Sequence, residues 1–160
     1  MTSLTIRRAR PGEEGLILTL LKELADYEKL LGSFHITEEV IRRDYLCEPP
    51  LLNCDLALDG GEPVGFATWY WTYASFAAAH GIFLEDLYVR AQFRGMGHGK
   101  ALLAHLAREA LAAKAARVEW SVLDWNQPSI EFYEELGARR HDGWYMYRLE
   151  HEALKKLGNG

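Results

Sequence analysis

The feature that most constrains the fold is a glycine-rich turn between a strand-like segment and an amphipathic helical segment. Residues Leu84–Val89 have the composition of a strand, and in the following stretch, Gln92–Lys100, glycine stands at positions 95, 97 and 99. Glycine adopts left-handed backbone conformations and lets the main chain approach a ligand closely. Successive N–H groups in such a turn, together with the N terminus of a helix, bind anions. The sequence therefore predicts a pyrophosphate cradle here, and the alternative is a turn that only begins a helix.

The spacing of the turn excludes two well-known phosphate motifs. A dinucleotide fingerprint requires G-x-G-x-x-G, but Lys100 stands three residues after Gly97. A P-loop requires G-x-x-x-x-G-K-[ST], but Arg94 replaces its first glycine and Ala101 its final Ser or Thr. A different pyrophosphate ligand is therefore expected, to which Arg94 and Lys100 add positive charge.

Hydrophobic periodicity around the turn predicts a single domain, residues 1–160, of the α/β (α+β) class. Apolar residues at 17, 20, 21 and 24 recur at helical spacing. A proline in the first turn and Gly137 at the end bound another helix. The predicted strands are 4–8, 54–58, 64–73, 82–89, 117–123 and 144–149, and the predicted helices are 11–29, a short one from Thr37 to before Pro49, 97–115 and 128–136. A strand, helix and strand over 82–123 suggest one parallel crossover in a mixed sheet.

Composition limits the function classes. The 160 residues carry a net charge of −5, with 49% hydrophobic and 26% charged residues, which is typical of a soluble globular domain and argues against a nucleic-acid binder. No apolar run approaches the roughly 18 residues of a membrane span. Cys47 and Cys54 form no C-x-x-C pair, and the six histidines show no H-x-x-x-H spacing. We expect a cytoplasmic protein without a metal site or a membrane anchor.

Several separated motifs resemble one enzyme family. The pattern Gln92-x-x-Gly95-x-Gly97 resembles the acetyl-CoA signature of the GNAT N-acetyltransferases. The segments Leu24–Lys29, Leu84–Asp86 and Asp124–Tyr133 are similar to the spermidine/spermine and thialysine N-acetyltransferase branch of that family. The resemblance covers almost the whole chain. Residues 30–35 and the residues after 137 match that branch of the family poorly. It implies a mixed, mostly antiparallel, splayed sheet flanked by helices, acetyl-CoA as co-substrate and a homodimer.

The resemblance also implies roles for individual residues. Main-chain groups of Leu87, Tyr88 and Val89 would pair with the pantetheine arm. The pyrophosphate would be held by Arg94, Gly95, Met96, Gly97, His98, Gly99 and Lys100. Asn126 and Ser129 would line the cofactor, Tyr133 would contact it as the catalytic acid, and Tyr27, Glu28 and Glu85 would face the amine.

The chemistry of acetyl transfer gives two of these residues a specific task. An ammonium has no lone pair, so a base must remove a proton, and Glu85, an acid in an apolar strand, is the predicted base. We expect Asp86 to point to the other face of the sheet because side chains alternate along a strand. The Tyr133 phenol can donate a proton to the leaving thiolate; its alternative is a packed aromatic residue. An alternative interpretation of Asn126 is that it only begins a helix. An alternative interpretation of Glu28 and Glu85 is that they are solvated carboxylates.

The sequence therefore predicts an acetyl-CoA-dependent N-acetyltransferase that transfers acetyl directly to a primary amine of a small cationic substrate, a polyamine or a thialysine- or lysine-like amino acid. Two alternatives stay open: an acetyltransferase for protein lysines or N termini, and a non-catalytic acyl-CoA-binding regulator. The aromatic residues of the third strand are expected to pack in the core or at a subunit interface: Trp69, Tyr70, Trp71 and Tyr73.

Overall fold

The computed structural model describes residues 3–160, which fall into two compact units. The first unit, to Trp125, holds a five-stranded sheet and three α-helices. The second unit, Asn126–Gly160, holds two further α-helices. The expectation of one domain stays a prediction.

The sheet follows the order of the chain. Its strands are β1 (Leu4–Arg8), β2 (Asn53–Asp59), β3 (Glu62–Ala74), β4 (Ala79–Val89) and β5 (Val118–Trp120). The first four pair antiparallel to their neighbours, and β5 pairs parallel to β4. The Asp59–Glu62 hairpin turn joins β2 and β3, as its Gly60-Gly61 pair predicts. The mixed, mostly antiparallel sheet is therefore confirmed.

The sheet opens between its last two strands. Only Ile82–Leu84 of β4 pairs with β5, at Val118–Trp120, whereas β4 continues to Val89. The fifth strand is shorter than the predicted 117–123, so β5 leaves the edge of β4 after three residue pairs. Main-chain groups of 85–89 on this side of β4 are therefore not bonded to β5, which is the splay that the family resemblance implies.

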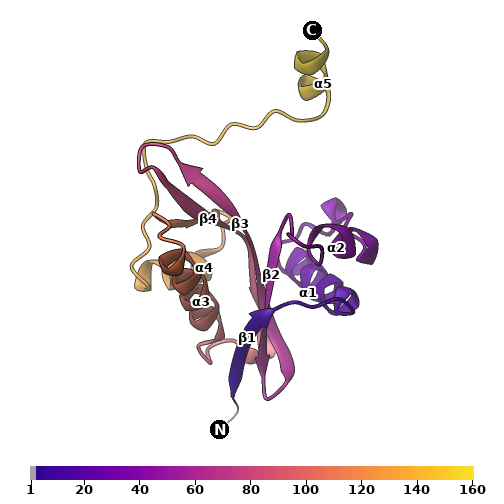
Figure 1. The fold of residues 1–160 in the computed structure, drawn as a ribbon, viewed down its shortest axis with the longest axis vertical. Helices are drawn as coiled ribbons and strands as arrows, with labels where there is room; N and C mark the ends of the chain where they lie inside the picture. The colour runs from indigo at the N-terminus through magenta and orange to yellow at the C-terminus, as the bar shows by residue number, and fades with distance from the viewer. Residues whose placement is uncertain (1–2) are drawn as a thin grey trace. The chain divides into compact units, whose positions relative to one another are not determined.

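Helices cover both faces of the sheet (Figure 1). On one face α1 (Glu14–Tyr27) and α2 (Glu38–Asp44) enclose a core with Leu56 and Phe66, and on the other α3 (His98–Ala112) packs on Ala57 and Val64. Burial of Ile17, Leu20, Leu21 and Leu24 confirms the predicted apolar face of α1, and α3 buries Leu102, Leu106 and Ala110.

Helix boundaries agree with the capping chemistry to within a few residues. The Thr37 hydroxyl accepts a hydrogen bond from the Val40 N–H at 3.3 Å and so caps α2, as predicted. The first helix ends at Tyr27, two residues earlier than expected, and Lys29 has a left-handed φ of 61° that no helix continues through. The third helix begins at His98 and ends at Ala112, inside the predicted 97–115.

The predicted strand Trp144–Leu149 is wrong. The second unit contains α4 (Gln127–Glu135) and α5 (His151–Asn159), and the described part of the chain assigns no strand to the residues between them. Trp144 is 73% exposed and Tyr147 92% exposed. A strand needs a neighbour for its main-chain hydrogen bonds, and β-branched or aromatic composition alone does not supply one. Helix α5, which carries Leu154 and Leu157 at helical spacing, was not predicted from the sequence.

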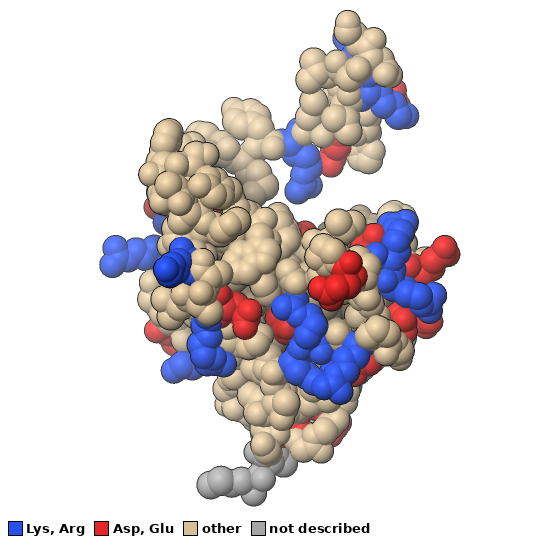
Figure 2. Space-filling model, viewed as in Figure 1, with Lys and Arg blue, Asp and Glu red and all other residues tan. Residues whose placement is uncertain are grey.

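Charged side chains of both signs mix on the surface. On the face seen in Figure 2, basic and acidic groups lie side by side in the region of α1 and α2. Several are paired there, with Arg7 bound to Glu13 at 2.6 Å and Arg42 to Glu14 at 3.2 Å. Along residues 3–160, every helix is too short or too polar to cross a bilayer.

We expect Gly65→Ala to destabilise the protein by about 2 kcal/mol, which corresponds to a fall in Tm of about 4–8 °C. A Cβ at this position in β3 would collide with the Tyr88 carbonyl oxygen, and it would lie 3.2 Å from the Val89 Cα. Both contacts are with the backbone of β4, which cannot shift without a substantial cost in free energy. Gly32→Ala is the control, because a Cβ there meets nothing within 4 Å. Equal melting temperatures for the two variants, measured by calorimetry, would contradict the expectation.

Candidate active site

The glycine turn presents main-chain donors at the start of α3. After β4 the chain forms a short 3-10 helix, η2 (Ala91–Phe93), and then takes left-handed conformations at Gly95 (φ 75°) and Gly97 (φ 87°). A Cβ on either glycine would meet nothing within 4 Å, so the conformation, not crowding, requires glycine. Gly97 is the N-cap of α3 and offers no capping side chain. The N–H groups of the first turn are therefore available to an anion.

The side chains of the turn do not all point where the sequence suggests. Arg94 lies back over β4: its Nε donates to the Val89 carbonyl at 2.9 Å, and its guanidinium lies 4.6 Å from the Tyr27 ring centroid and 5.7 Å from that of Tyr88. His98 is buried, and its Nε2 lies 3.5 Å from the Asp59 carboxylate. Only the main chain of His98 can therefore serve an anion, whereas Lys100 is exposed.

A β-bulge changes the direction of the acidic pair in β4. Thr68 of β3 pairs with Asp86, but the next residue, Trp69, pairs with Leu84, so Glu85 is an extra residue in β4. Leu84 accordingly packs in the core below α3, and Tyr88, four residues later, packs in the core below α1. The expectation that Asp86 points away from Glu85 is wrong, because the bulge interrupts the alternation of side chains and both residues line one cavity.

This cavity combines apolar walls with three carboxylates. Its volume is about 640 Å³, and its acidic residues are Glu28, directly after α1, with Glu85 and Asp86 of β4. Side chains of α1, α2 and the segment between them form apolar walls, among them Leu21, Leu24, Phe34, Ile36 and Val40. Tyr45 and His35 also line it. Apolar walls with a few converging polar groups are typical of a small-molecule site, and the carboxylates favour a cation.

The carboxylates in this cavity are perturbed by burial. Burial raises the pKa of Asp86 to about 6; the hydrogen bond from the Thr68 hydroxyl lowers it, and the charges of Glu85 and Glu28 raise it. Burial also raises the pKa of Glu28. The pKa of the Tyr45 phenol is raised above its ordinary value, first by burial and then by Asp86. A carboxylate poised near neutral pH beside other acids is suited to hold an ammonium group or accept its proton.

The structure brings together some of the predicted amine-side residues. Glu28 and Glu85 line the cavity, and Asp86, which the sequence analysis placed elsewhere, joins them. Tyr27 is not among the lining residues; its ring contacts Trp125 at 6.3 Å between centroids and lies under Arg94. The bulge that adds Asp86 depends on pairing between β3 and β4, and no residue type in the sequence marks it.

The predicted residues Asn126, Ser129 and Tyr133 belong to the second unit. Asn126 is buried and stands at the N-cap of α4, and Pro128 occupies the first turn, as predicted. Gly137 takes a φ of 89° just past the end of the helix. Ser129 and Tyr133 are half-buried, and the Tyr133 ring lies 5.3 Å from that of Phe132. The catalytic and coenzyme roles of these residues stay predictions. Within residues 3–160, no three His, Cys, Asp or Glu side chains are grouped as metal ligands.

Comparison with known proteins identifies the family of the chain. The family model described as "Acetyltransferase (GNAT) family" matches residues 18–138. Thialysine N-epsilon-acetyltransferase of Sus scrofa is 36% identical and aligns over 98% of this chain and 98% of its own length. Its Caenorhabditis elegans counterpart is 31% identical over 99% of both chains. Spermidine/spermine N(1)-acetyltransferase-like protein 1 of Homo sapiens is 34% identical over 93% of this chain, which corresponds to 23% of that protein.

Solved structures support the same fold. An integron cassette protein from the mobile metagenome of V. cholerae superposes with a TM-score of 0.83 over 99% of both chains, at 24% identity. Ribosomal-protein-alanine N-acetyltransferase from Brucella melitensis biovar Abortus 2308 superposes with a TM-score of 0.74 over 93% of this chain and all of that chain, at 19% identity. At these low sequence identities, the superpositions are evidence for the fold only. GNAT acetyltransferases use acetyl-CoA as co-substrate, and on the family match and the near full-length relatives this chain is an N-acetyltransferase that belongs to the GNAT family.

Proposed function

We propose that this enzyme transfers an acetyl group from acetyl-CoA directly to a primary amine of a small cationic acceptor, a polyamine or a thialysine- or lysine-like amino acid. The observation that carries the proposal is the cavity of about 640 Å³ in which Glu28, Glu85 and Asp86 converge between apolar walls. Carboxylates attract the ammonium group, and the walls suit the methylene chain that joins the nitrogens of such acceptors. The names of the thialysine and spermidine/spermine relatives support the same acceptor class.

The coenzyme would bind along the opened edge of β4. Main-chain groups of Leu87, Tyr88 and Val89 extend past the last pair with β5 and are the proposed partners of the pantetheine arm. The turn from Arg94 to Lys100 would hold the pyrophosphate through the N–H groups at the start of α3, with side-chain charge from Lys100. Asn126 and Ser129 would line the same ligand. The open space where a Cβ would stand on Gly95 and Gly97 supports this placement, because a ligand can approach the main chain there.

The carboxylates would then prepare the amine for attack. Asp86, with a pKa of about 6, is ionised at neutral pH and is close enough to that pH to act as a proton acceptor. Glu85 lines the same cavity and is exposed, so it would pass the proton to solvent. After the nitrogen attacks the thioester carbon, the Tyr133 phenol would give its proton to the departing thiolate. No covalent enzyme intermediate is required.

An acceptor panel tests the proposal. Purified enzyme is incubated with acetyl-CoA and one amine at a time: spermidine, a short diamine, lysine, thialysine or a lysine-containing peptide. Release of the CoA thiol is followed, with a reaction lacking amine as the blank. We expect turnover with at least one small cationic amine and none with the peptide. Failure of every small amine to release CoA would refute the proposed acceptor class.

We expect Glu85→Gln to lower kcat/KM and to move its acidic limb to lower pH. The charge of Glu85 raises the pKa of Asp86, so its removal lets Asp86 ionise at lower pH. The rate falls, most clearly near neutral pH, because the exit for the proton is lost. The measurement is the pH profile of kcat/KM between pH 5 and 9 with the best acceptor. An unchanged profile would remove Glu85 from the mechanism.

Two further features belong to the proposal. We infer a homodimer, supported by exposed aromatic residues on β3, with Trp71 43% and Tyr73 60% exposed. A cytoplasmic location remains the expectation from composition. Light scattering on the purified enzyme tests the homodimer, and a monomeric mass at micromolar concentration would contradict it.

A further inference from the structure

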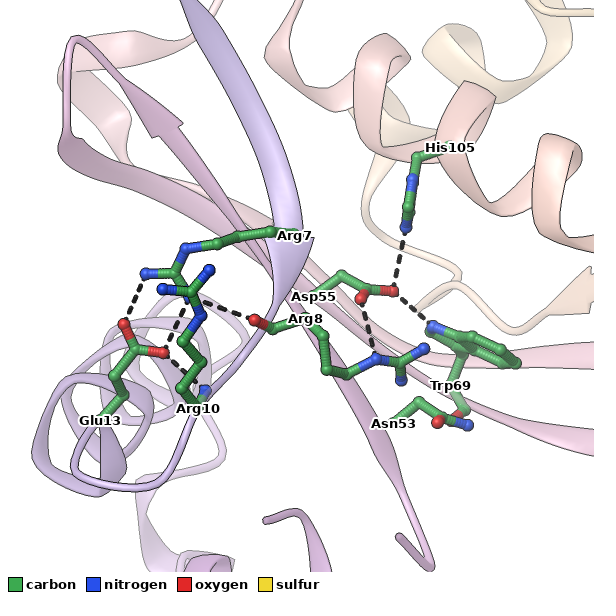
Figure 3. Close-up of polar contacts among 8 residues, drawn as sticks. All are labelled: Arg7, Arg8, Arg10, Glu13, Asn53, Asp55, Trp69 and His105. Carbon is green, nitrogen blue, oxygen red and sulfur yellow. Dashed lines mark hydrogen bonds and ion pairs between the residues drawn. The ribbon is translucent and has the colours of Figure 1, made fainter. Parts of the chain in front are cut away.

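Two histidine–aspartate contacts join α3 to β2 on the face of the sheet opposite the acidic cavity. His98 Nε2 lies 3.5 Å from Asp59 Oδ2, and His105 Nε2 lies 3.3 Å from Asp55 Oδ2. His98, His105 and the buried Leu102 follow one stripe of α3, and Asp55, Ala57 and Asp59 alternate along one face of β2. Figure 3 shows His105 reaching from its helix to the Asp55 carboxylate. These side chains have no part in the proposed chemistry.

The spacing of the two contacts matches the geometry of a helix lying antiparallel to a strand. Seven residues of α3 rise about 10.5 Å, and four residues of β2 span about 13 Å. The first contact falls at the start of α3 and the second two turns later. Between them Leu102 packs in the apolar cluster that contains Ala57 and Val64. The helix is thus held at two polar points with an apolar layer between, which fixes both its position along the strand and its rotation.

The two contacts differ in strength. Asp55 is 1% exposed and also accepts the Trp69 Nε1–H at 2.7 Å and lies 3.4 Å from Arg8 Nε (Figure 3). The partners of Asp55 come from three elements besides β2, so the His105–Asp55 contact is the more strongly supported of the two. Neither His98 ring nitrogen nor Asp59 Oδ1 makes a hydrogen bond among the described residues. The pair at the coenzyme end is therefore a close contact between buried groups without a hydrogen bond, and it has fewer polar partners than the Asp55 contact.

We propose that His98–Asp59 and His105–Asp55 are positioning pairs that fix the N terminus of α3 and thereby set the affinity for the coenzyme pyrophosphate. The inference rests on the proposed coenzyme site. The N–H groups that would bind the anion belong to the same turn as His98, and binding depends steeply on where fixed donors point. The acidic cavity lies on the α1 and α2 side of the sheet, so the acceptor site does not share this support.

The test separates coenzyme binding from acceptor binding. Titration calorimetry gives Kd for CoA, and steady-state kinetics gives KM for acetyl-CoA, KM for the amine and kcat. We expect His98→Leu and Asp59→Leu each to raise Kd and the acetyl-CoA KM by about 10-fold, with the amine KM and kcat at saturating acetyl-CoA within about twofold. The double variant is expected to be no worse than either single one, because either change already breaks the pair.

The second pair and a surface control complete the design. His105→Leu is expected to raise Kd for CoA and to lower Tm, whereas His105→Gln keeps a donor for Asp55 and restores most of both. Arg108→Ala, an exposed change on the same helix, is the matched control and is expected to match wild type. Folded His98 and His105 variants that bind CoA within twofold of wild type would overturn the inference. A wild-type enzyme that does not bind CoA would overturn the proposed coenzyme site as well.

Discussion

Asp86→Asn is expected to lower kcat/KM about 100-fold at pH 7.5, the lower end of the usual contribution of a general base. Asp86 has a pKa of about 6, so wild-type kcat/KM should fall as pH drops through 6 and the carboxylate takes up a proton. Asparagine has nearly the same shape but cannot accept the proton of the amine. The acidic limb of the profile should therefore disappear together with the rate. The measurement is the pH dependence of kcat/KM, which reports the free enzyme.

Thr68→Val provides a control that moves the same limb in the opposite direction to Glu85→Gln. The Thr68 hydroxyl donates a hydrogen bond to the ionised Asp86 and lowers its pKa. Without this donor the pKa of Asp86 rises, and the acidic limb should shift to higher pH while the rate on the plateau is largely kept. If the acidic limb of the pH profile persists in Asp86→Asn, or does not shift in Thr68→Val, a group other than Asp86 controls it.

Tyr133→Phe is expected to reduce kcat by about 100-fold to 1,000-fold with little change in either KM, the range typical of a positioned proton donor. The substitution removes only the phenolic oxygen, and the half-buried ring keeps its contact with Phe132. Rapid-mixing and steady-state kinetics with the best acceptor provide the measurement.

Phe132→Leu is the matched control for this variant. It disturbs the same aromatic contact from the neighbouring position without removing a proton donor. We expect its kcat to stay within about threefold of wild type, with any loss appearing in Tm. If Tyr133→Phe and Phe132→Leu lower kcat equally, the tyrosine acts through packing and the proton has another source.

Local patterns predicted most of the fold. The stripe from Ile17 to Leu24, the Thr37 cap, the Gly60-Gly61 hairpin and the glycine turn before α3 each depend on neighbours in the sequence, and each is found as expected. The order of the strands and the parallel crossover then follow from short connections and handedness. The glycine turn that precedes α3 was therefore recognisable from the sequence before any tertiary contact was known.

What could not be predicted depends on pairing between distant segments. The extra residue at Glu85 exists because β3 and β4 change register between Thr68 and Trp69, and strict alternation then gives the wrong face for Asp86. The prediction for Trp144–Leu149 was wrong for a related reason: its composition favours a strand, but no strand is assigned to it within the described residues. In both cases the outcome depends on burial and strand pairing, which local amino-acid composition does not predict.

The bulge at Glu85 also separates two traits that evolution can change independently. One inserted residue turns Asp86 toward α1, whereas Leu84 packs on the α3 side, so two residues of β4 that alternation would place on one face serve different layers. In the proposed mechanism, substitutions in the walls around the cavity, such as those at Phe34 or Ile36, would change which amine is accepted without touching the glycine turn. A library that varies only these wall residues should yield enzymes of altered acceptor preference that all retain the parent's affinity for acetyl-CoA.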